Sequence, residues 1–419
     1  MAQSPALCCA YLEYFDAPEL AGRRRAVPVL YSRGSHYQVG YDVGRTFGSL
    51  ISGFIAGSER LREFERRADS AAVRAWRTPR CQRAARRRRR RRRAVQEANA
   101  ERIPSQLFLL HMDDIIETIE EGRSSAPPAA VGCSSIAVLR PGVAVLGHTE
   151  DSFEDALNHW YVLSAHILPS DEEREQGAGE ERFASLCYAG HLPGYTMGYS
   201  AAGMVFSVNT LSPRMLRPGR TPRVFLTRAM LAAKSFEDAQ RILLDEGLGA
   251  ANGCSVNMLW TGGQGTKAFS LHNIEVAPSR TEEARSQLDI RCYSRVPDAA
   301  AAEPLIHCNR YERLKVEEVR GPIILSSLAR LKTIHSYATP TARAQIAKIL
   351  SDTSGPDYRV FESRKNRRVL TIAAGIFDLE SRTWSVYMDE PATSEPVAVL
   401  PLLFGPPSTD PPAAKQVAK

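Results

Sequence analysis

The sequence lacks paired cysteines, long hydrophobic runs and the start of a secretion signal, and each absence narrows the class of protein. None of the eight cysteines forms a CxxC pair, which argues against a disulfide framework or a structural zinc site and favours a reduced chain. No run approaches the roughly 18 apolar residues of a membrane helix. The start has no basic region, and Glu13 and Asp16 come early, which is atypical of a signal peptide. We therefore expect a cytoplasmic globular protein without a membrane partner.

The sequence also has almost no charge imbalance outside one short segment. The net charge is +7, but Arg86 to Arg93 form an unbroken run of eight arginines. Removing these eight from the 54 basic residues leaves 46 against 47 acidic ones. Such a run repels itself, so we expect a disordered, solvated insertion at 80–94. A nuclear-import or RNA-binding patch is the alternative, and the lack of an RNA-type aromatic platform disfavours a nucleic-acid partner.

The hydrophobic period changes once along the chain. Residues 1–132 are predicted to be mainly helical after a short strand in VPVLYSRG, whereas SSIAVLR and VAVLGHT read as strands joined by a Pro-Gly turn. We further expect helices over 222–247 and 326–350, hairpins over 254–276 and 369–388, and a disordered tail at 405–419. Runs of strands and helices in this order favour a layered α+β fold.

Cys133 is the residue with the most suggestive context. It follows Gly132 and a Pro/Ala-rich linker, and it opens the first strand of the second half. A thiol in this position can attack the preceding carbonyl, giving a thioester that water opens. Cys133 would then be a new N-terminus, whose α-amine, with an ordinary pKa of about 7.7–8.0, can act as base for its own side chain. The other cysteines of this half are expected to be small buried hydrophobic residues: Cys187, Cys254, Cys292 and Cys308.

Three polar residues are candidate partners of Cys133. Asp151 lies just past the end of the adjacent predicted strand, and Asn209 and Asn257 occupy strand positions in apolar surroundings. A buried amide is costly unless it is hydrogen bonded, so both asparagines are candidate donors to an oxyanion or a substrate carbonyl. The alternative is that they satisfy local backbone groups.

Several motifs carry a family resemblance: RGSHYQVGYDVGRTF, IPSQLFLLHMDD, GCSSIAV…GHTED, FSVNTL, CSVNMLW and HCNRY. Together they resemble the acyl-CoA:6-aminopenicillanic acid acyltransferase-like group of N-terminal nucleophile (Ntn) hydrolases. The resemblance covers roughly residues 27–400, apart from the Arg-rich segment. It implies a four-layer αββα sandwich and self-cleavage into chains 1–132 and 133–419 that remain associated. It also implies no cofactor, and a homodimer of such chain pairs is one assembly that it allows.

The resemblance also assigns roles to individual residues. Cys133 matches the nucleophile, Gly132 the residue before the cut and Asp151 the site aspartate of the family. Asn257 matches the oxyanion asparagine, and Asn209 and Asn309 match positions near the pocket.

Within the group, HMDDI, GCSS and LGHTED…LNHWYVLSAHI resemble hydrolases of β-alanyl amides of biogenic amines, such as N-β-alanyldopamine and carcinine. Such a substrate carries an ammonium group, which needs a carboxylate. Glu150 and Asp151 would point to opposite faces of a strand, so only one can line the site. We expect Asp151 to orient the nucleophile or bind the amine, with Glu150 or Asp155 as the second choice; a surface pair is the alternative. The lack of an arginine near Thr149 argues against bile-salt and penicillin V amides.

Other motifs are weaker. GYSAA at 198–202 lacks the last glycine of a nucleophile elbow, GGQGTK at 262–267 lacks Walker spacing, and the His307-Cys308 pair lacks metal-ligand partners, so we expect no metal site. Two functional alternatives remain. The same acyl-enzyme could transfer its acyl group to an amine, or the Arg run could serve an RNA-binding or scaffold protein with a dead hydrolase domain.

Overall fold

A computed structural model gives the fold of most of the chain. It describes residues 23–58, 61–62, 65, 103–112, 115, 132–175, 177–261, 269–293, 303–364, 367 and 369–405. The predicted Arg-rich insertion at 80–94 and the tail beyond residue 405 lie outside these ranges.

Two sheets form the centre of the molecule. The first has the strand order β1 (Val29–Gly34), β4 (Trp160–Ile167), β5 (Glu181–Tyr188), β6 (Met197–Ser200), β7 (Met204–Leu211), β8 (Gly253–Thr261), β9 (Phe269–Ala277) and β10 (Gln287–Tyr293). The second has the order β11 (Leu305–His307), β2 (Cys133–Arg140), β3 (Val143–Phe153), β12 (Val369–Asp378), β13 (Thr383–Tyr387) and β14 (Ala398–Pro401). Neighbouring strands are antiparallel, except for the parallel pair β1 and β4.

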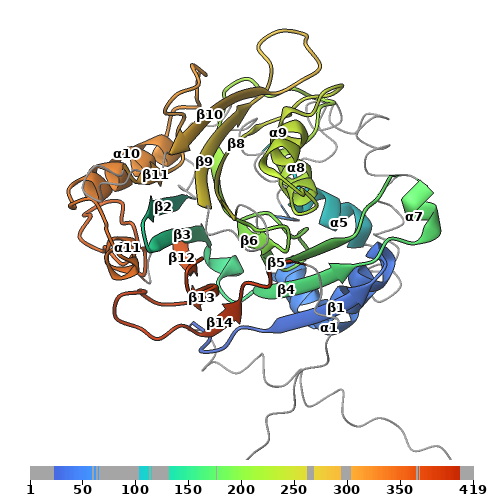
Figure 1. Cartoon of the computed structure of the whole chain (residues 1–419), viewed down its shortest axis with the longest axis horizontal. Helices are drawn as coiled ribbons and strands as arrows, with labels where there is room; N and C mark the ends of the chain where they lie inside the picture. The colour runs from blue at the N-terminus through green and yellow to red at the C-terminus, as the bar shows by residue number, and fades with distance from the viewer. Residues whose placement is uncertain are drawn as a thin grey trace, which may run out of the picture.

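Helices cover both outer faces of the sheet pair (Figure 1). The eight-stranded sheet carries α1 (His36–Gly57), α5 (Ile103–Leu110), α8 (Arg223–Met230) and α9 (Phe236–Leu244). The six-stranded sheet carries α10 (Pro322–His335) and α11 (Arg343–Leu350), while η3 (Glu154–Ala156) and α7 (Asp171–Glu175) are short connecting turns. The predicted four-layer αββα arrangement is therefore confirmed. None of the described helices combines the length and hydropathy needed to cross a bilayer.

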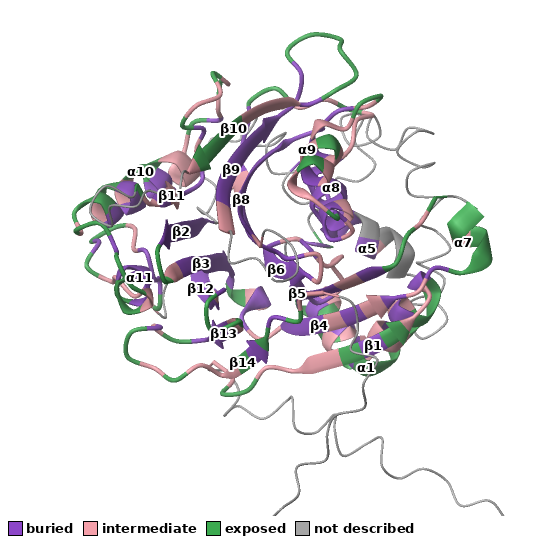
Figure 2. Cartoon of the chain, viewed as in Figure 1, coloured by how far each residue is buried: buried purple, intermediate pink, exposed green. Residues whose placement is uncertain are grey.

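Strands β2 and β3 are buried on both faces, because each face meets a different layer (Figure 2). Ile136 and Val138 belong to the cluster packed against α10 and α11, whereas Ala137 and Leu139 belong to the core on the other face. Gly147 allows α11 to approach closely, since a Cβ there would lie 2.6 Å from Ile346 Cγ2. Polar side chains on these two strands are therefore buried and need partners.

The helix predictions for the second half were wrong in extent. Residues 222–247 form α8 and α9, and Ser235 begins α9 by accepting a hydrogen bond from Asp238 N. Residues 326–350 form the end of α10 and then α11, and Pro340 lies between them, where its missing N–H disfavours a continuous helix. The hairpins β8–β9 and β12–β13 are confirmed.

Candidate active site

Gly132 and Cys133 lie where the chain enters β2. The carbonyl oxygen of Gly132 accepts a hydrogen bond of 2.8 Å from the backbone N–H of Asp151 on β3. A Cβ at position 132 would lie 2.4 Å from Arg330 Nη2 and 2.9 Å from Asn309 Oδ1. Lack of space for a side chain therefore explains the glycine before Cys133.

Asn309 forms hydrogen bonds with both the backbone nitrogen and the sulfur of Cys133. Its Oδ1 accepts from Cys133 N at 2.8 Å, and its Nδ2 donates to Cys133 Sγ at 3.2 Å. The cysteine is 4% exposed, and burial together with the charge of Glu150 raises the pKa of its thiol to about 12, although Asn309 and Arg330 oppose this shift. A thiol with this pKa needs a nearby base before it can act as a nucleophile.

Two further donors fix the carbonyl of Cys133. Asn209 Nδ2 lies 3.0 Å from this oxygen, and Arg330 Nη1 lies 2.7 Å from it. Arg330 also donates to Asn309 Oδ1 at 2.6 Å, so it ties the site to α10. The sequence analysis missed Arg330. Its signal is a polar stripe in an apolar helix, because Ser326, Ser327 and Arg330 are all buried on α10.

Asn257 is connected to Cys133 through Asn209. Its Nδ2 donates to Asn209 Oδ1 at 2.7 Å, its Oδ1 accepts from Asn273 Nδ2 at 2.8 Å, and Asn273 Oδ1 accepts from Arg313 at 2.6 Å. These amides form a ladder across β7, β8 and β9. The oxyanion role of Asn257 stays a prediction, and its amide is linked to Cys133 through Asn209.

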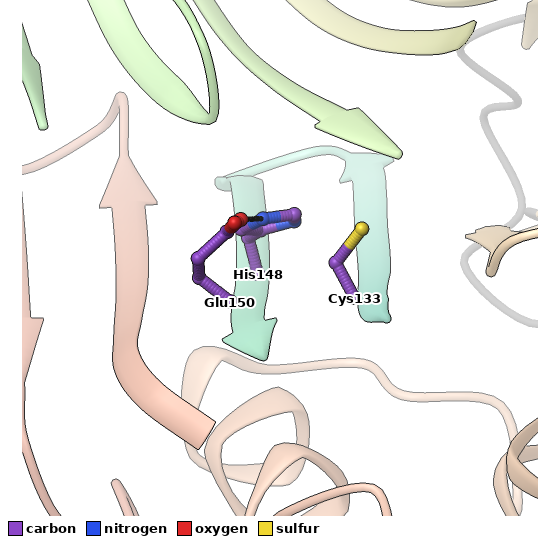
Figure 3. Close-up of side chains that lie close together, drawn as sticks. All are labelled: Cys133, His148 and Glu150. Atoms are coloured by element: carbon purple, nitrogen blue, oxygen red, sulfur yellow. Dashed lines mark hydrogen bonds and ion pairs between the residues drawn. The ribbon is translucent and has the colours of Figure 1, made fainter. Parts of the chain in front are cut away.

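Glu150, not Asp151, shares a face with Cys133 (Figure 3). Cys133 Sγ, a His148 nitrogen and a Glu150 oxygen all lie within 4.8 Å of one another. Glu150 Oε2 lies 3.0 Å from His148 Nε2, and its Oε1 accepts from Tyr188 OH at 2.6 Å.

The side chain of Asp151 points to the opposite face of β3. There it accepts a hydrogen bond from Thr371 at 2.6 Å. Burial raises its pKa to about 7, against the opposing effects of Arg330 and Thr371. Asp155 is carried past the end of β3 by η3. Of the three carboxylates considered from the sequence, Glu150 is thus the one placed beside the sulfur.

Cys133, His148 and Glu150 also form the group of described residues whose donor atoms come close enough to share a metal ion. Both nitrogens of His148 and both oxygens of Glu150 already have hydrogen-bond partners in the protein, including Ser135 and Tyr188. The arrangement is that of a hydrogen-bonded network, and the expectation of no metal or cofactor stays a prediction.

Comparisons with known proteins identify the family of the chain. The family described as acyl-coenzyme A:6-aminopenicillanic acid acyl-transferase matches residues 138–393. The β-alanyl-dopamine/carcinine hydrolase of Drosophila melanogaster is 38% identical over 397 residues, which cover 91% of this chain and 98% of that protein. The crystal structure of a mutant conjugated bile acid hydrolase from Clostridium perfringens matches 66% of this chain and all of its own, at 10% identity and a TM-score of 0.34. The nucleophile role of Cys133, which lies just before the matched residues, stays a prediction. The chain therefore belongs to the acyl-coenzyme A:6-aminopenicillanic acid acyl-transferase family of Ntn amide hydrolases.

Proposed function

We propose that the chain cleaves itself between Gly132 and Cys133 and then hydrolyses β-alanyl amides of biogenic amines. The first part is supported by the buried Gly132–Cys133 junction, whose carbonyl and sulfur both have polar partners. After the cut the α-amine of Cys133 would serve as base for its own thiol. The two chains would remain associated, and a cytoplasmic location, inferred from the cysteine pattern, belongs to the same proposal.

The position of Glu150 is the observation that favours β-alanyl amides as the substrate class. In a β-alanyl group two methylenes separate the acyl carbon from the ammonium nitrogen. When the acyl carbon is bonded to Cys133 Sγ, the ammonium group can reach a carboxylate that lies within 4.8 Å of the sulfur. Glu150 keeps capacity for this partner, since a carboxylate has about four acceptor sites and two are in use. The named activity of the Drosophila relative is consistent with such a substrate.

The reaction then follows from the site. The Cys133 thiolate attacks the amide carbonyl of the substrate, the amine leaves with a proton from the α-ammonium group, and water opens the thioester. Buried amide donors on Asn309 and Asn209 are the candidates to stabilise the developing oxyanion. The products are β-alanine and the free amine.

Acyl transfer is the alternative within the family, whose description names transferases. The acyl-enzyme would be the same, and an amine would replace water as the acceptor. Adding a second amine to the assay separates the two: a new amide product indicates transfer, whereas β-alanine alone indicates hydrolysis. The hydrogen bonds of Cys133 N and Sγ to Asn309 favour an active site over a dead scaffold.

Two measurements test the proposal. Intact mass spectrometry of wild type and Cys133→Ala should find fragments ending at Gly132 and starting at Cys133 in wild type alone. The cleaved enzyme should then hydrolyse β-alanyl-dopamine at least about 100-fold faster, in kcat/KM, than butanoyl-dopamine, which has a methyl group in place of the ammonium. Asp155→Asn should keep this preference. Equal rates for the two amides, or for acetyl-dopamine, would exclude an ammonium site.

A further inference from the structure

The uncut chain lacks the base that the mature enzyme is proposed to use. Before cleavage the nitrogen of Cys133 is a peptide N–H, which donates to Asn309 Oδ1 and has no basic lone pair. The thiol is buried and holds its proton with a pKa of about 12. The inference below rests on the proposed self-cleavage and concerns the group that removes this proton.

The register of β2 and β3 selects one carboxylate. Cys133 pairs with Glu150, and the hydrogen bond from Asp151 N to Gly132 O shows that Cys133 and Glu150 form a non-hydrogen-bonded pair. Side chains of such pairs approach more closely than those of hydrogen-bonded pairs. Glu150 therefore stands directly across from the attacking sulfur, while the carbonyl under attack is held by the next residue of the same strand.

Two side chains orient this carboxylate. Tyr188 on β5 donates to Oε1 at 2.6 Å. His148, two residues before Glu150 on β3, contacts Oε2 at 3.0 Å through Nε2, and its Nδ1 lies 2.9 Å from Ser135 Oγ. With its proton on Nε2, His148 donates to the carboxylate. The hydroxyl of Ser135 donates to Asn209 Oδ1 at 3.0 Å. All three side chains are buried, so water does not compete for these contacts.

We propose that Glu150, oriented by Tyr188 and His148, is the base of the first cut. Glu150 accepts the thiol proton as Cys133 Sγ bonds to the carbonyl carbon of Gly132, and the oxygen of that carbonyl gains charge against the Asp151 N–H. The carbon–nitrogen bond then breaks, and the proton passes from Glu150 to the departing nitrogen of Cys133. Water opens the resulting thioester, which releases the Gly132 carboxyl group and restores the thiol.

The cut then changes what Glu150 does. The new α-amine of Cys133 can act as base in every later turnover, so Glu150 is left as a carboxylate beside the sulfur. One side chain would serve self-cleavage first and the substrate ammonium afterwards. His148 and Tyr188 are positioning residues in this scheme, because they act through Glu150.

The test follows cleavage of full-length chains made by cell-free translation, sampled at intervals for intact mass. Glu150→Gln keeps the shape of the side chain but removes its basicity, and should slow the cut by at least about 100-fold. Tyr188→Phe and His148→Gln should slow it less, because the carboxylate remains. Glu154→Gln, an exposed acid on η3, is the matched control and should cut at the wild-type rate.

Chemical rescue separates a base from a structural role. Glu150→Ala should cut slowly in sodium chloride and faster in sodium formate, because formate supplies a carboxylate to the vacated space. Wild-type cleavage rates in Glu150→Gln, or no acceleration of Glu150→Ala by formate over chloride, would overturn the assignment while leaving self-cleavage intact. An uncut wild-type chain would instead refute self-cleavage itself. If the melting temperature of Glu150→Gln lies far below that of Cys133→Ala, slow cleavage of Glu150→Gln could reflect misfolding. The assignment then depends on whether folded Glu150→Ala cleaves faster in formate than in chloride.

Discussion

At the residue scale, the sequence singled out Cys133 as the candidate nucleophile and ranked Asp151 ahead of Glu150 as its carboxylate partner. Strand alternation correctly required Glu150 and Asp151 to point to opposite faces. Which of them faces Cys133 depends on the register between β2 and β3, and on the layer that each face meets. Both are non-local properties that no short motif contains. Arg330 was missed for the same reason, since nearly 200 residues of sequence separate it from Cys133.

Replacing Asp151 should stabilise the uncut protein in a pH-dependent way. An unfolded aspartate has a pKa of about 3.9, whereas burial raises the pKa of Asp151 to about 7 in the folded state. Below pH 4 both states hold the proton. Between these values only the unfolded state ionises, so the free energy of unfolding falls as pH rises, by up to about 1.4 kcal/mol per pH unit. Asp151→Asn in a Cys133→Ala background removes this loss and keeps an acceptor for Thr371.

The melting temperature of Asp151→Asn, measured relative to Cys133→Ala alone, should therefore rise from pH 5 to pH 8. Asp155→Asn, in the same background, should not produce this trend. A difference that is constant over this pH range would contradict a raised pKa at position 151.

At the element scale, regular hydrophobic patterns predicted the longer strands correctly, whereas two short edge strands were not predicted. Strands β2 and β3, joined by a Pro-Gly turn, are as predicted. Strand β11 has three residues and owes its conformation to pairing with β2, and β14 is a four-residue edge strand. Segments this short carry too few residues for a period to be recognised. Their positions follow from the partner strand and not from their own pattern.

The asparagine ladder across β7, β8 and β9 should behave as one unit. Asn257→Leu removes the donor to Asn209 Oδ1 and the acceptor for Asn273 Nδ2. Asn209 Oδ1 still accepts from Ser135 Oγ, and Asn273 Nδ2 still donates to Ser255 Oγ. The loss is therefore that of two hydrogen bonds worth about 0.5–1.5 kcal/mol each, and the free energy of unfolding in urea should fall by about 1–3 kcal/mol.

The kcat of the cleaved Asn257→Leu enzyme should also fall, because Asn209 holds the Cys133 carbonyl. Ser270→Ala, on the half-buried end of β9, is the control; a similar small loss in both variants would mean that the ladder is not cooperative.

At the scale of the whole molecule, the segment before Cys133 is part of the main core. Strand β1 extends the eight-stranded sheet by pairing with β4, and α1 buries Phe47, Ile51 and Phe54. The ring of Phe47 stacks on Tyr161 of β4 with centroids 4.0 Å apart. Removing the covalent link at Gly132 leaves all of these contacts in place.

After the proposed cut, fragments 1–132 and 133–419 should therefore elute together in native size-exclusion chromatography and separate only in denaturant. Phe47→Ala should lower the urea concentration at which they separate, because truncating a buried Phe side chain to Ala costs about 3–5 kcal/mol. Tyr41→Ala changes an aromatic residue of α1 that is 41% exposed, and should leave that concentration nearly unchanged. Fragments that part without denaturant would show that the covalent link, and not the shared sheet and core, holds the N-terminal segment in place.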